Sequence, residues 1–322
     1  ARIQYYLSSR SVIIFITHNA ASNIFFLTSN SGKILHQTRQ ISSNESINNT
    51  KPKRIRAISC DVTGTLVSFL GRIEDHYGDA AHTCGVEISQ EKKLLIPQSF
   101  NKAYKETSAA HPCFGNSCIS SKEWWRRCVK RSFDLVGTSM DEPEEERVFQ
   151  RVYSTFGSHA AYGVFDDAKP FLKWCMRHGI ACGVLSNADE RYGDSILPML
   201  GLSDHMQFFT FSKNVGVEKP GKEIFDAAIQ DAQPWLCLGN KRSDIKQLMP
   251  EEVLHIGNDY QKDYVGATSA GFHAVLLDRY DEEEVAKRWR EGGAPVFKDL
   301  IDVVEWLGRE QYELGSRDEC KI

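Results

Sequence analysis

The chain has 322 residues, 41% hydrophobic and 25% charged, which suits a globular protein with one sizeable core and length for a second, smaller unit. Its 39 basic and 43 acidic residues, in mixed order, give a formal net charge of −4, so no basic stripe favours nucleic acid as a partner. Nine cysteines lack paired metal-binding spacing, so we expect reduced thiols inside the cell. No apolar stretch reaches the roughly 18 residues of a membrane span, so we expect no membrane partner.

The first fifty residues are rich in Ser and Asn and contain no acid before Glu45. This composition is similar to that of an organellar transit peptide, and it also fits a disordered leader. We therefore expect residues 1–52 to be a presequence or a disordered leader, and the location to be cytoplasmic or organellar. The apolar patches SVIIFI and NIFFLT are too short to span a bilayer, and we expect them to form one face of a presequence helix.

Four short apolar runs past this segment read as buried parallel strands. They lie at 55–60, 179–187, 252–259 and 271–278. Amphipathic helical stretches separate them, and such alternation predicts a parallel sheet with right-handed crossovers and helices on both faces. We expect a Rossmann-like, three-layer α/β core built from residues 53–71 and 164–310, followed by a tail at 311–322.

Residues 72–163 interrupt this alternation. Four successive stretches have apolar residues at helical spacing, and several begin with Ser, Asp or Pro. We expect an α-helical bundle inserted as a cap just after the first core strand.

Polar residues stand at the ends of three of the predicted strands. Asp61 ends the first, Ser186 and Asn187 end the second, and Asp259 ends the third. An unpaired carboxylate at the end of a buried strand is costly unless it meets solvent, a partner, a metal or a substrate. Ligands of parallel sheets bind at the carboxyl ends of the strands, so these residues mark a candidate site.

Each of these residues also has an ordinary structural reading. Ser186 and Asn187 fit a strand-to-loop pair, and Lys219 beside a proline fits a solvated loop lysine. Asp259 fits a turn, and Asp263 fits the cap of a helix that begins near residue 264. Taken together, these ordinary readings are less convincing, because chance would have to place all of these residues at the same edge of one sheet.

Four motifs occur in order at these strand ends: DVTGTL (61–66), LSN (185–187), EKP (218–220) and IGNDYQKDYVGATSAG (256–271). They resemble the four motifs of the haloacid dehalogenase (HAD) superfamily, and the resemblance covers residues 55 to about 308. The helical insertion resembles the C1 cap of subfamily I. The stretches SSKEWW and VYSTF are similar to the rhythmically expressed gene 2-like group.

The resemblance implies a Mg²⁺-dependent hydrolase, a phosphatase that acts on a small phosphorylated metabolite through an aspartyl-phosphate. Asp61 would be the nucleophile, with Thr63 in the slot of the acid/base and Lys219 as a fixed cation. The implied phosphate-binding residues are Gly64, Thr65, Ser186, Asn187 and Lys219. The implied Mg²⁺ ligands are Asp61, the Thr63 carbonyl, Asp259 and Asp263.

Two positions depart from the family pattern. Thr63 replaces the usual second Asp, so slow turnover of alkyl phosphates is expected, with acyl and aryl phosphates less affected. Asn258 stands where the first acid of the last motif often lies, so either Asn258 or Asp259 is the residue nearest the metal, and we favour Asp259. These departures support an alternative, a catalytically weak or inactive HAD-like binding or interaction protein. Carbon–halogen hydrolysis by Asp61 is disfavoured, because it has no use for metal carboxylates.

Overall fold

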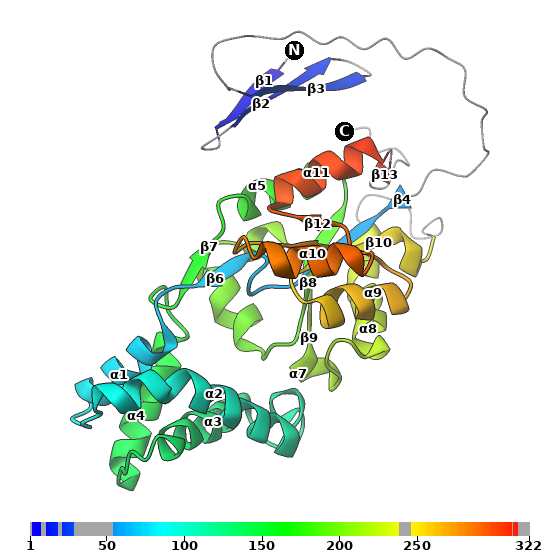
Figure 1. Cartoon of the computed structure of the whole chain (residues 1–322). Coiled ribbons are helices and arrows are strands. Elements are labelled where there is room, and N and C mark those ends of the chain that lie inside the picture. The colour runs from blue at the N-terminus through cyan, green and yellow to red at the C-terminus, as the bar shows by residue number, and fades with distance from the viewer. Residues whose placement is uncertain are drawn as a thin grey trace. The chain divides into compact units, whose positions relative to one another are not determined.

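A computed structural model of the whole chain describes residues 54–237, 246–310 and 312–314, together with the backbone of three strands before residue 30. These strands, β1 (Arg2–Leu7), β2 (Ser11–His18) and β3 (Ala21–Thr28), form an antiparallel sheet in a unit of its own (Figure 1). The expected presequence helix is therefore wrong for the two apolar patches, which lie in β2 and β3, because β-branched and aromatic residues favour strands. The rest of the expected leader lies outside the described residues, and its targeting role stays a prediction.

The central sheet has six strands, all parallel, in the order β12-β11-β10-β5-β8-β9. Their bounds are β5 Ala57–Cys60, β8 Ala181–Ser186, β9 Phe208–Phe211, β10 Val253–Gly257, β11 His273–Leu277 and β12 Val296–Phe297. The four predicted strands are the four inner ones. The edge strands β9 and β12 were not predicted, because they are too short to show a pattern of their own.

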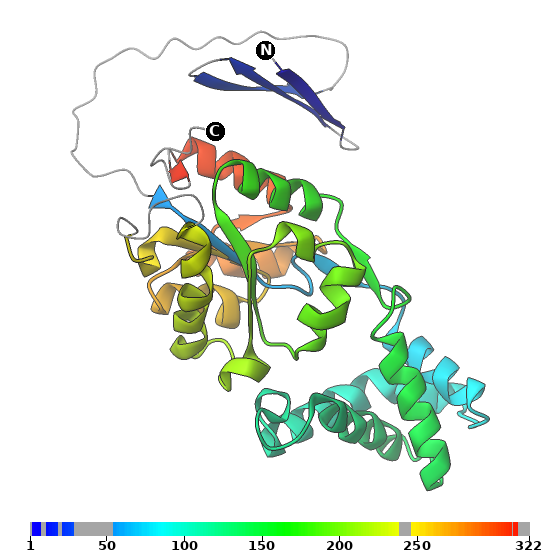
Figure 2. The same ribbon diagram turned by 180° about the vertical axis from the view of Figure 1, so that it is seen from behind.

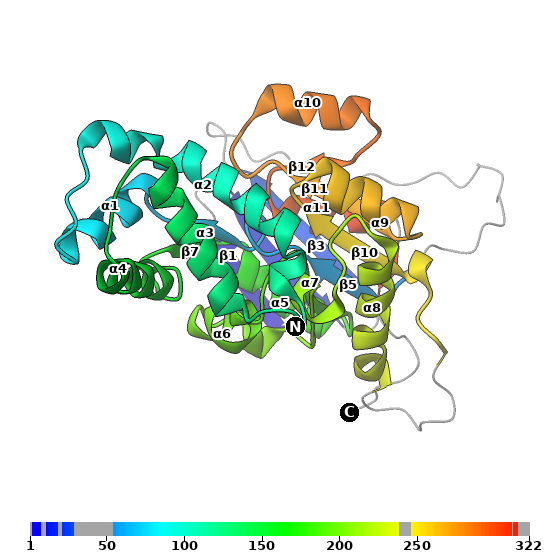
Figure 3. The ribbon, with the colours of Figure 1, turned by 90° about the horizontal axis from the view of Figure 1, so that it is seen from below.

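Helices cover both faces of this sheet, which confirms the three-layer α/β core. On one face, α5 (Ala168–Arg177), α6 (Leu197–Met199) and α11 (Leu300–Arg309) pack on alternate strand residues such as Ile58 and Val184. On the other, α8 (Lys222–Ala232) and α9 (Gly266–Ser269) pack on Ala57 and Leu185, and Figure 3 shows these two helices together beside β5 and β10. Because both faces are buried, most residues of the inner strands are apolar.

The chain leaves the core through β6 (Val67–Phe69) and returns through β7 (Tyr162–Val164), and these two strands pair antiparallel. Between them lie α1 (Ile73–Thr83), α2 (Gln90–Ala110), α3 (Ser121–Leu135) and α4 (Glu142–Thr155), gathered into one bundle (Figure 2). The bundle has its own apolar cluster, which includes Tyr77, Ile96, Phe133, Val148 and Phe149. The predicted helical insertion is thus present.

Four further elements belong to the described part. The short helix α7 (Ser212–Val215) follows β9, and α10 (Glu283–Glu291) lies between β11 and β12. The expected tail contains a strand, β13 (Glu313–Leu314), which pairs in parallel with β4 (Arg54–Ile55). Among the described residues, no helix combines the length and the hydropathy needed to cross a membrane.

Candidate active site

The motif residues meet at the carboxyl ends of three neighbouring strands, because β10, β5 and β8 lie side by side in the sheet. Asp61 follows the central strand of the three, and Lys219 enters from the loop between α7 and α8. The motif residues line a cavity of about 280 Å³. Its lining consists of Asp61, Thr63, Ser186, Asn187, Ala188, Tyr192, Lys219, Asn258, Asp259, Lys262 and Asp263.

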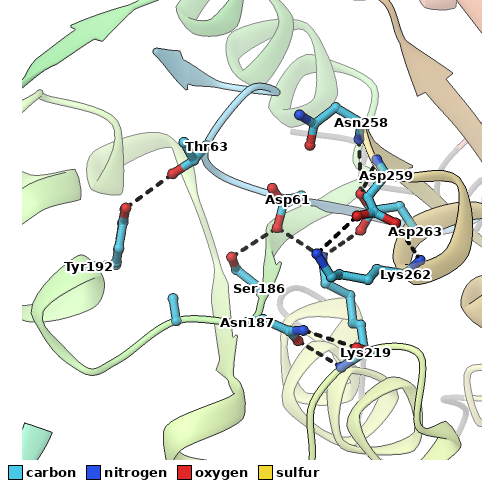
Figure 4. Close-up of a pocket in the computed structure, with 11 residues that line it drawn as sticks. Asp61, Thr63, Ser186, Asn187, Tyr192, Lys219, Asn258, Asp259, Lys262 and Asp263 are labelled. Carbon is cyan, nitrogen blue, oxygen red and sulfur yellow. Dashed lines mark hydrogen bonds and ion pairs between the residues drawn. The ribbon is translucent and has the colours of Figure 1, made fainter. Parts of the chain in front are cut away.

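Asp61 is held through one of its two carboxylate oxygens. Its Oδ1 accepts hydrogen bonds from Ser186 Oγ at 2.9 Å and from Lys219 Nζ at 2.8 Å. Figure 4 shows the other oxygen pointing away from Lys219, toward the side of the cavity where Thr63 and Asn258 lie. The carboxylate is therefore oriented by two donors and presents a second oxygen to the cavity.

Lys219 is a buried cation between two carboxylates. Its side chain is 1% exposed, and its Nζ donates to Asp61, to Asp263 at 2.6 Å and to the carbonyl of Leu185 at 2.9 Å. Burial by itself would lower the pKa of this ammonium group, but Asp263 and Asp61 outweigh burial and leave that pKa above its usual value. The solvated-lysine reading is therefore wrong, and the site holds a permanent positive charge.

Asn187 fixes the main chain of Lys219. Its Nδ2 donates to the carbonyl oxygen of Lys219 at 3.0 Å, and its Oδ1 accepts from the Lys219 amide at 2.7 Å. Both ends of this side-chain amide are thus bonded to Lys219, so the side chain of Asn187 positions the lysine. The expected contact of Asn187 with phosphate stays a prediction.

Asp263 has both carboxylate oxygens occupied by protein donors. Oδ1 accepts from Lys219 and from His255 Nε2 at 3.1 Å, and Oδ2 accepts from the amides of Asn258 and Asp259, each at 2.9 Å. Burial alone would raise the pKa of Asp263, but the ammonium of Lys219 and the hydrogen bond from His255 reverse this and hold it well below its usual range. Asp263 therefore joins Lys219 to the loop after β10, and its expected role as a metal ligand stays a prediction.

Asp259 has both carboxylate oxygens engaged within the turn that follows it. Its Oδ1 accepts from the amides of Gln261 and Lys262, at 3.0 and 2.9 Å, and its Oδ2 pairs with Lys262 Nζ at 2.9 Å. This is the geometry of an N-cap, which agrees with the turn reading of Asp259; the metal role that we favoured for it stays a prediction.

Asn258 packs against the loop that carries Asp61. A side-chain carbon added to Gly64 would come within 2.1 Å of Asn258 Nδ2, and Gly64 has a φ of +82°. Glycine is therefore required at position 64 both by its backbone conformation and by this close approach. Which of the two alternatives, Asn258 or Asp259, lies nearest a metal stays a prediction.

Thr65 does not reach the cavity. The residue is fully buried, and its carbonyl oxygen accepts from Arg279 at 2.6 Å. Its hydroxyl has no hydrogen-bond partner among the described residues. The side chain of Thr65 is therefore directed into the core, and the expected phosphate contact of this residue, which rests on backbone amides, stays a prediction.

Thr63 faces the cavity, and its Oγ1 lies 3.1 Å from the hydroxyl of Tyr192. Tyr192 was not predicted as a site residue. The one available signal was its position in the loop after a strand that ends in the LSN motif, where rim residues are expected.

The cap contacts the core loops that carry site residues. Lys213 Nζ donates to the carbonyls of Phe114, Asn116 and Ile119, at 3.0, 2.6 and 2.9 Å. Trp125 Nε1 donates to Asp189 Oδ2 at 2.5 Å, a few residues before Tyr192. The bundle is thus attached to the segments that precede Tyr192 and Lys219.

Comparison with known proteins agrees with this geometry. Residues 55–271 match the model of the haloacid dehalogenase-like hydrolase family. Haloacid dehalogenase-like hydrolase domain-containing protein 3 of Mus musculus is 31% identical over 225 residues, which are 70% of this chain and 82% of that protein. The Rhythmically expressed gene 2 protein of Drosophila melanogaster is 24% identical over 245 residues, 74% of this chain and 88% of that protein.

Solved structures show the same fold. The HAD-hydrolase YfnB of Bacillus subtilis, solved bound to magnesium, is 15% identical and has a TM-score of 0.53, with 80% of this chain and all of that chain covered. The L-2-haloacid dehalogenase of Xanthobacter autotrophicus is 19% identical, with a TM-score of 0.53 over 79% of this chain and 98% of that one. The chain therefore belongs to the haloacid dehalogenase-like hydrolase family.

Proposed function

We propose that this hydrolase is a phosphatase in which Asp61 attacks a phosphoryl group and forms an aspartyl-phosphate. The observation that supports this most directly is the pairing of Asp61 with Ser186 and Lys219 inside one cavity. A carboxylate that is oriented through one oxygen and free at the other is suited to nucleophilic attack. The volume of about 280 Å³ fits a small substrate.

The chain's own residues supply most of the positive charge and hydrogen-bond donors that a phosphoryl group requires. Lys219 neutralises negative charge as the phosphoryl group approaches the anionic Asp61, and Ser186 offers its hydroxyl to the same region. Lys219 is 1% exposed, so its charge acts in a medium of low dielectric and is worth more than in water. Asn187 and Asp263 keep the ammonium in place, so little reorganisation is needed during the reaction.

Magnesium fits this site if the protein and the substrate hold the ion together. The described residues contain no cluster of three or more His, Cys, Asp or Glu side chains that could hold a metal. Mg²⁺ commonly binds one or two carboxylates together with substrate phosphate and waters, and Asp61, the amide oxygen of Asn258 and the Thr63 carbonyl form such a minimal donor set. When bound, the ion would neutralise charge on the transferring phosphoryl group. Because only one ligand is anionic, we expect weak affinity for the ion.

The preferred substrates are phosphates with good leaving groups. Thr63 cannot donate a proton as readily as the carboxylic acid usual at its position, and general acid–base catalysis typically contributes about 10²- to 10⁴-fold. Acyl and aryl phosphates need that proton less than alkyl phosphates do, so they should be hydrolysed faster.

The test is Mg²⁺-dependent hydrolysis of acetyl phosphate and 4-nitrophenyl phosphate by the wild type, Asp61→Asn and a control, Asp204→Asn. Asp204 is exposed and does not line the cavity, so the control should keep full activity. Loss of turnover in Asp61→Asn alone supports the proposal. Turnover that survives Asp61→Asn would overturn it.

A binding protein without turnover is the second candidate, favoured by the hydroxyl of Thr63 and the amide of Asn258 where the family pattern has carboxylates. It predicts that the wild type binds phosphate esters without hydrolysing either substrate. Release of chloride from a haloacid without Mg²⁺ would point instead to carbon–halogen chemistry.

A further inference from the structure

A second hydroxyl, that of Tyr192, lies next to the hydroxyl of Thr63. Tyr192 and Thr63 both line the cavity, with 3.1 Å between their side-chain oxygens. Tyr192 opens the π-helical turn Tyr192–Ile196, which follows β8, and so reaches Thr63 from the loop of the neighbouring strand. Figure 4 shows the pair on one side of Asp61 and Lys219 on the other. A group attacked by Asp61 would therefore have a cation on one flank and two linked hydroxyls on the other.

Tyr192 is held in this position from several sides. Its ring lies edge-on to Tyr162, with 6.1 Å between the ring centroids, and its amide donates to the carbonyl of Asp189 at 3.3 Å. The preceding residue, Arg191, places its guanidinium 4.2 Å from the ring centre of Tyr153 in the cap. Seating of the cap therefore fixes the backbone that presents the Tyr192 hydroxyl.

A phenol ordinarily keeps its proton near neutral pH. An alkoxide is a stronger base than a phenolate, so the phenol of Tyr192 can deliver its proton to an alkoxide oxygen that is leaving phosphorus.

We infer that Tyr192 and Thr63 form a proton relay that replaces the carboxylic acid missing from position 63. The inference rests on the proposed phosphatase function and adds a catalytic residue to it. As Asp61 forms its bond to phosphorus, the bond from phosphorus to the leaving oxygen breaks. Thr63 gives its hydroxyl proton to that oxygen and takes the proton of Tyr192, so an alcohol departs and Tyr192 is left as a phenolate.

The second half-reaction restores every group. Water attacks phosphorus, and its proton passes through Thr63 to the phenolate of Tyr192. The bond between phosphorus and Asp61 breaks, which releases inorganic phosphate and the free carboxylate. The cycle consumes one water and one phosphate ester, and it requires no further reactant.

Leaving-group dependence separates this role from a structural one. Glycerol phosphate needs a proton on its leaving oxygen, whereas 4-nitrophenyl phosphate leaves as a stable anion. We would compare kcat/KM for the two substrates, because this ratio covers the steps up to the first irreversible one and excludes later hydrolysis of the phospho-enzyme. The variants are Tyr192→Phe, Thr63→Val and the double variant, with Tyr280→Phe as a matched control, because Tyr280 is exposed and does not line the cavity.

The relay predicts a selective loss. Tyr192→Phe should lower kcat/KM for glycerol phosphate by about 10²-fold and that for 4-nitrophenyl phosphate by less than about threefold. Thr63→Val should show the same pattern, and the double variant should lose little more, because the two residues act as one unit. Tyr280→Phe should match the wild type.

Three outcomes would overturn the relay. One is an equal loss of kcat/KM for both substrates in Tyr192→Phe, which would indicate a packing role. Another is additive losses in the double variant. The third is a wild type that hydrolyses 4-nitrophenyl phosphate but not glycerol phosphate. Failure of the phosphatase proposal itself would look different, because turnover of 4-nitrophenyl phosphate would then be absent or would survive Asp61→Asn.

Discussion

Replacing Asp263 by Asn tests whether this residue braces the site or binds a metal. Its carboxylate accepts four hydrogen bonds, from Lys219, His255 and two backbone amides. A side-chain amide has one acceptor oxygen, so two of these bonds would be lost and an NH₂ group would face other donors. Hydrogen bonds to charged groups contribute about 1.5–3 kcal/mol each, and breaking a buried ion pair on one side costs about 3–5 kcal/mol.

We therefore expect Asp263→Asn to lower the free energy of unfolding by about 3–5 kcal/mol. The corresponding fall in Tm is roughly 6–20 °C for a domain of this size class. The assay is thermal and urea unfolding in a buffer with a chelator, with Asp204→Asn as control. A carboxylate kept only for a metal would repel Asp61 when no metal is bound, so its neutralisation would leave stability unchanged or raise it. That result would refute the bracing role.

Three further substitutions test the remaining assignments. Thr63→Asp should raise kcat/KM for glycerol phosphate by about 10²-fold, because a carboxylic acid is the better proton donor; no gain would contradict the account of slow turnover. Asn258→Asp should lower the Mg²⁺ concentration that gives half-maximal hydrolysis, because it adds a second anionic ligand; an unchanged requirement would place the ion elsewhere. Asp259→Ala should cost about 1 kcal/mol of unfolding free energy through the lost N-cap and leave the Mg²⁺ requirement unaltered; a large rise in that requirement would restore Asp259 as a ligand.

The inner part of the fold could be predicted from the sequence, because burial on both faces produces apolar runs such as residues 181–186 that are visible locally. The amphipathic spacing of the insertion likewise indicated its helices. Edge strands β9 and β12 have only 4 and 2 residues, and their membership of the sheet depends on neighbours distant in sequence. The patches in β2 and β3 were wrongly expected in a helix, because their β-branched and aromatic residues were given less weight than the composition of the segment.

The residues of the site likewise fall into those that the sequence indicated and those that only the structure revealed. Motif order identified Asp61, Ser186 and Lys219 from the sequence, since each stands beside a recognisable strand end or proline. Only the tertiary structure decided that Asp263 braces Lys219, that Asp259 caps a helical turn, and that Tyr192 meets Thr63 across 129 residues of chain. The physical reason is that a carboxylate or hydroxyl has the same local sequence signature whichever donor it meets. Its partner is set by the loops that the sheet order brings together.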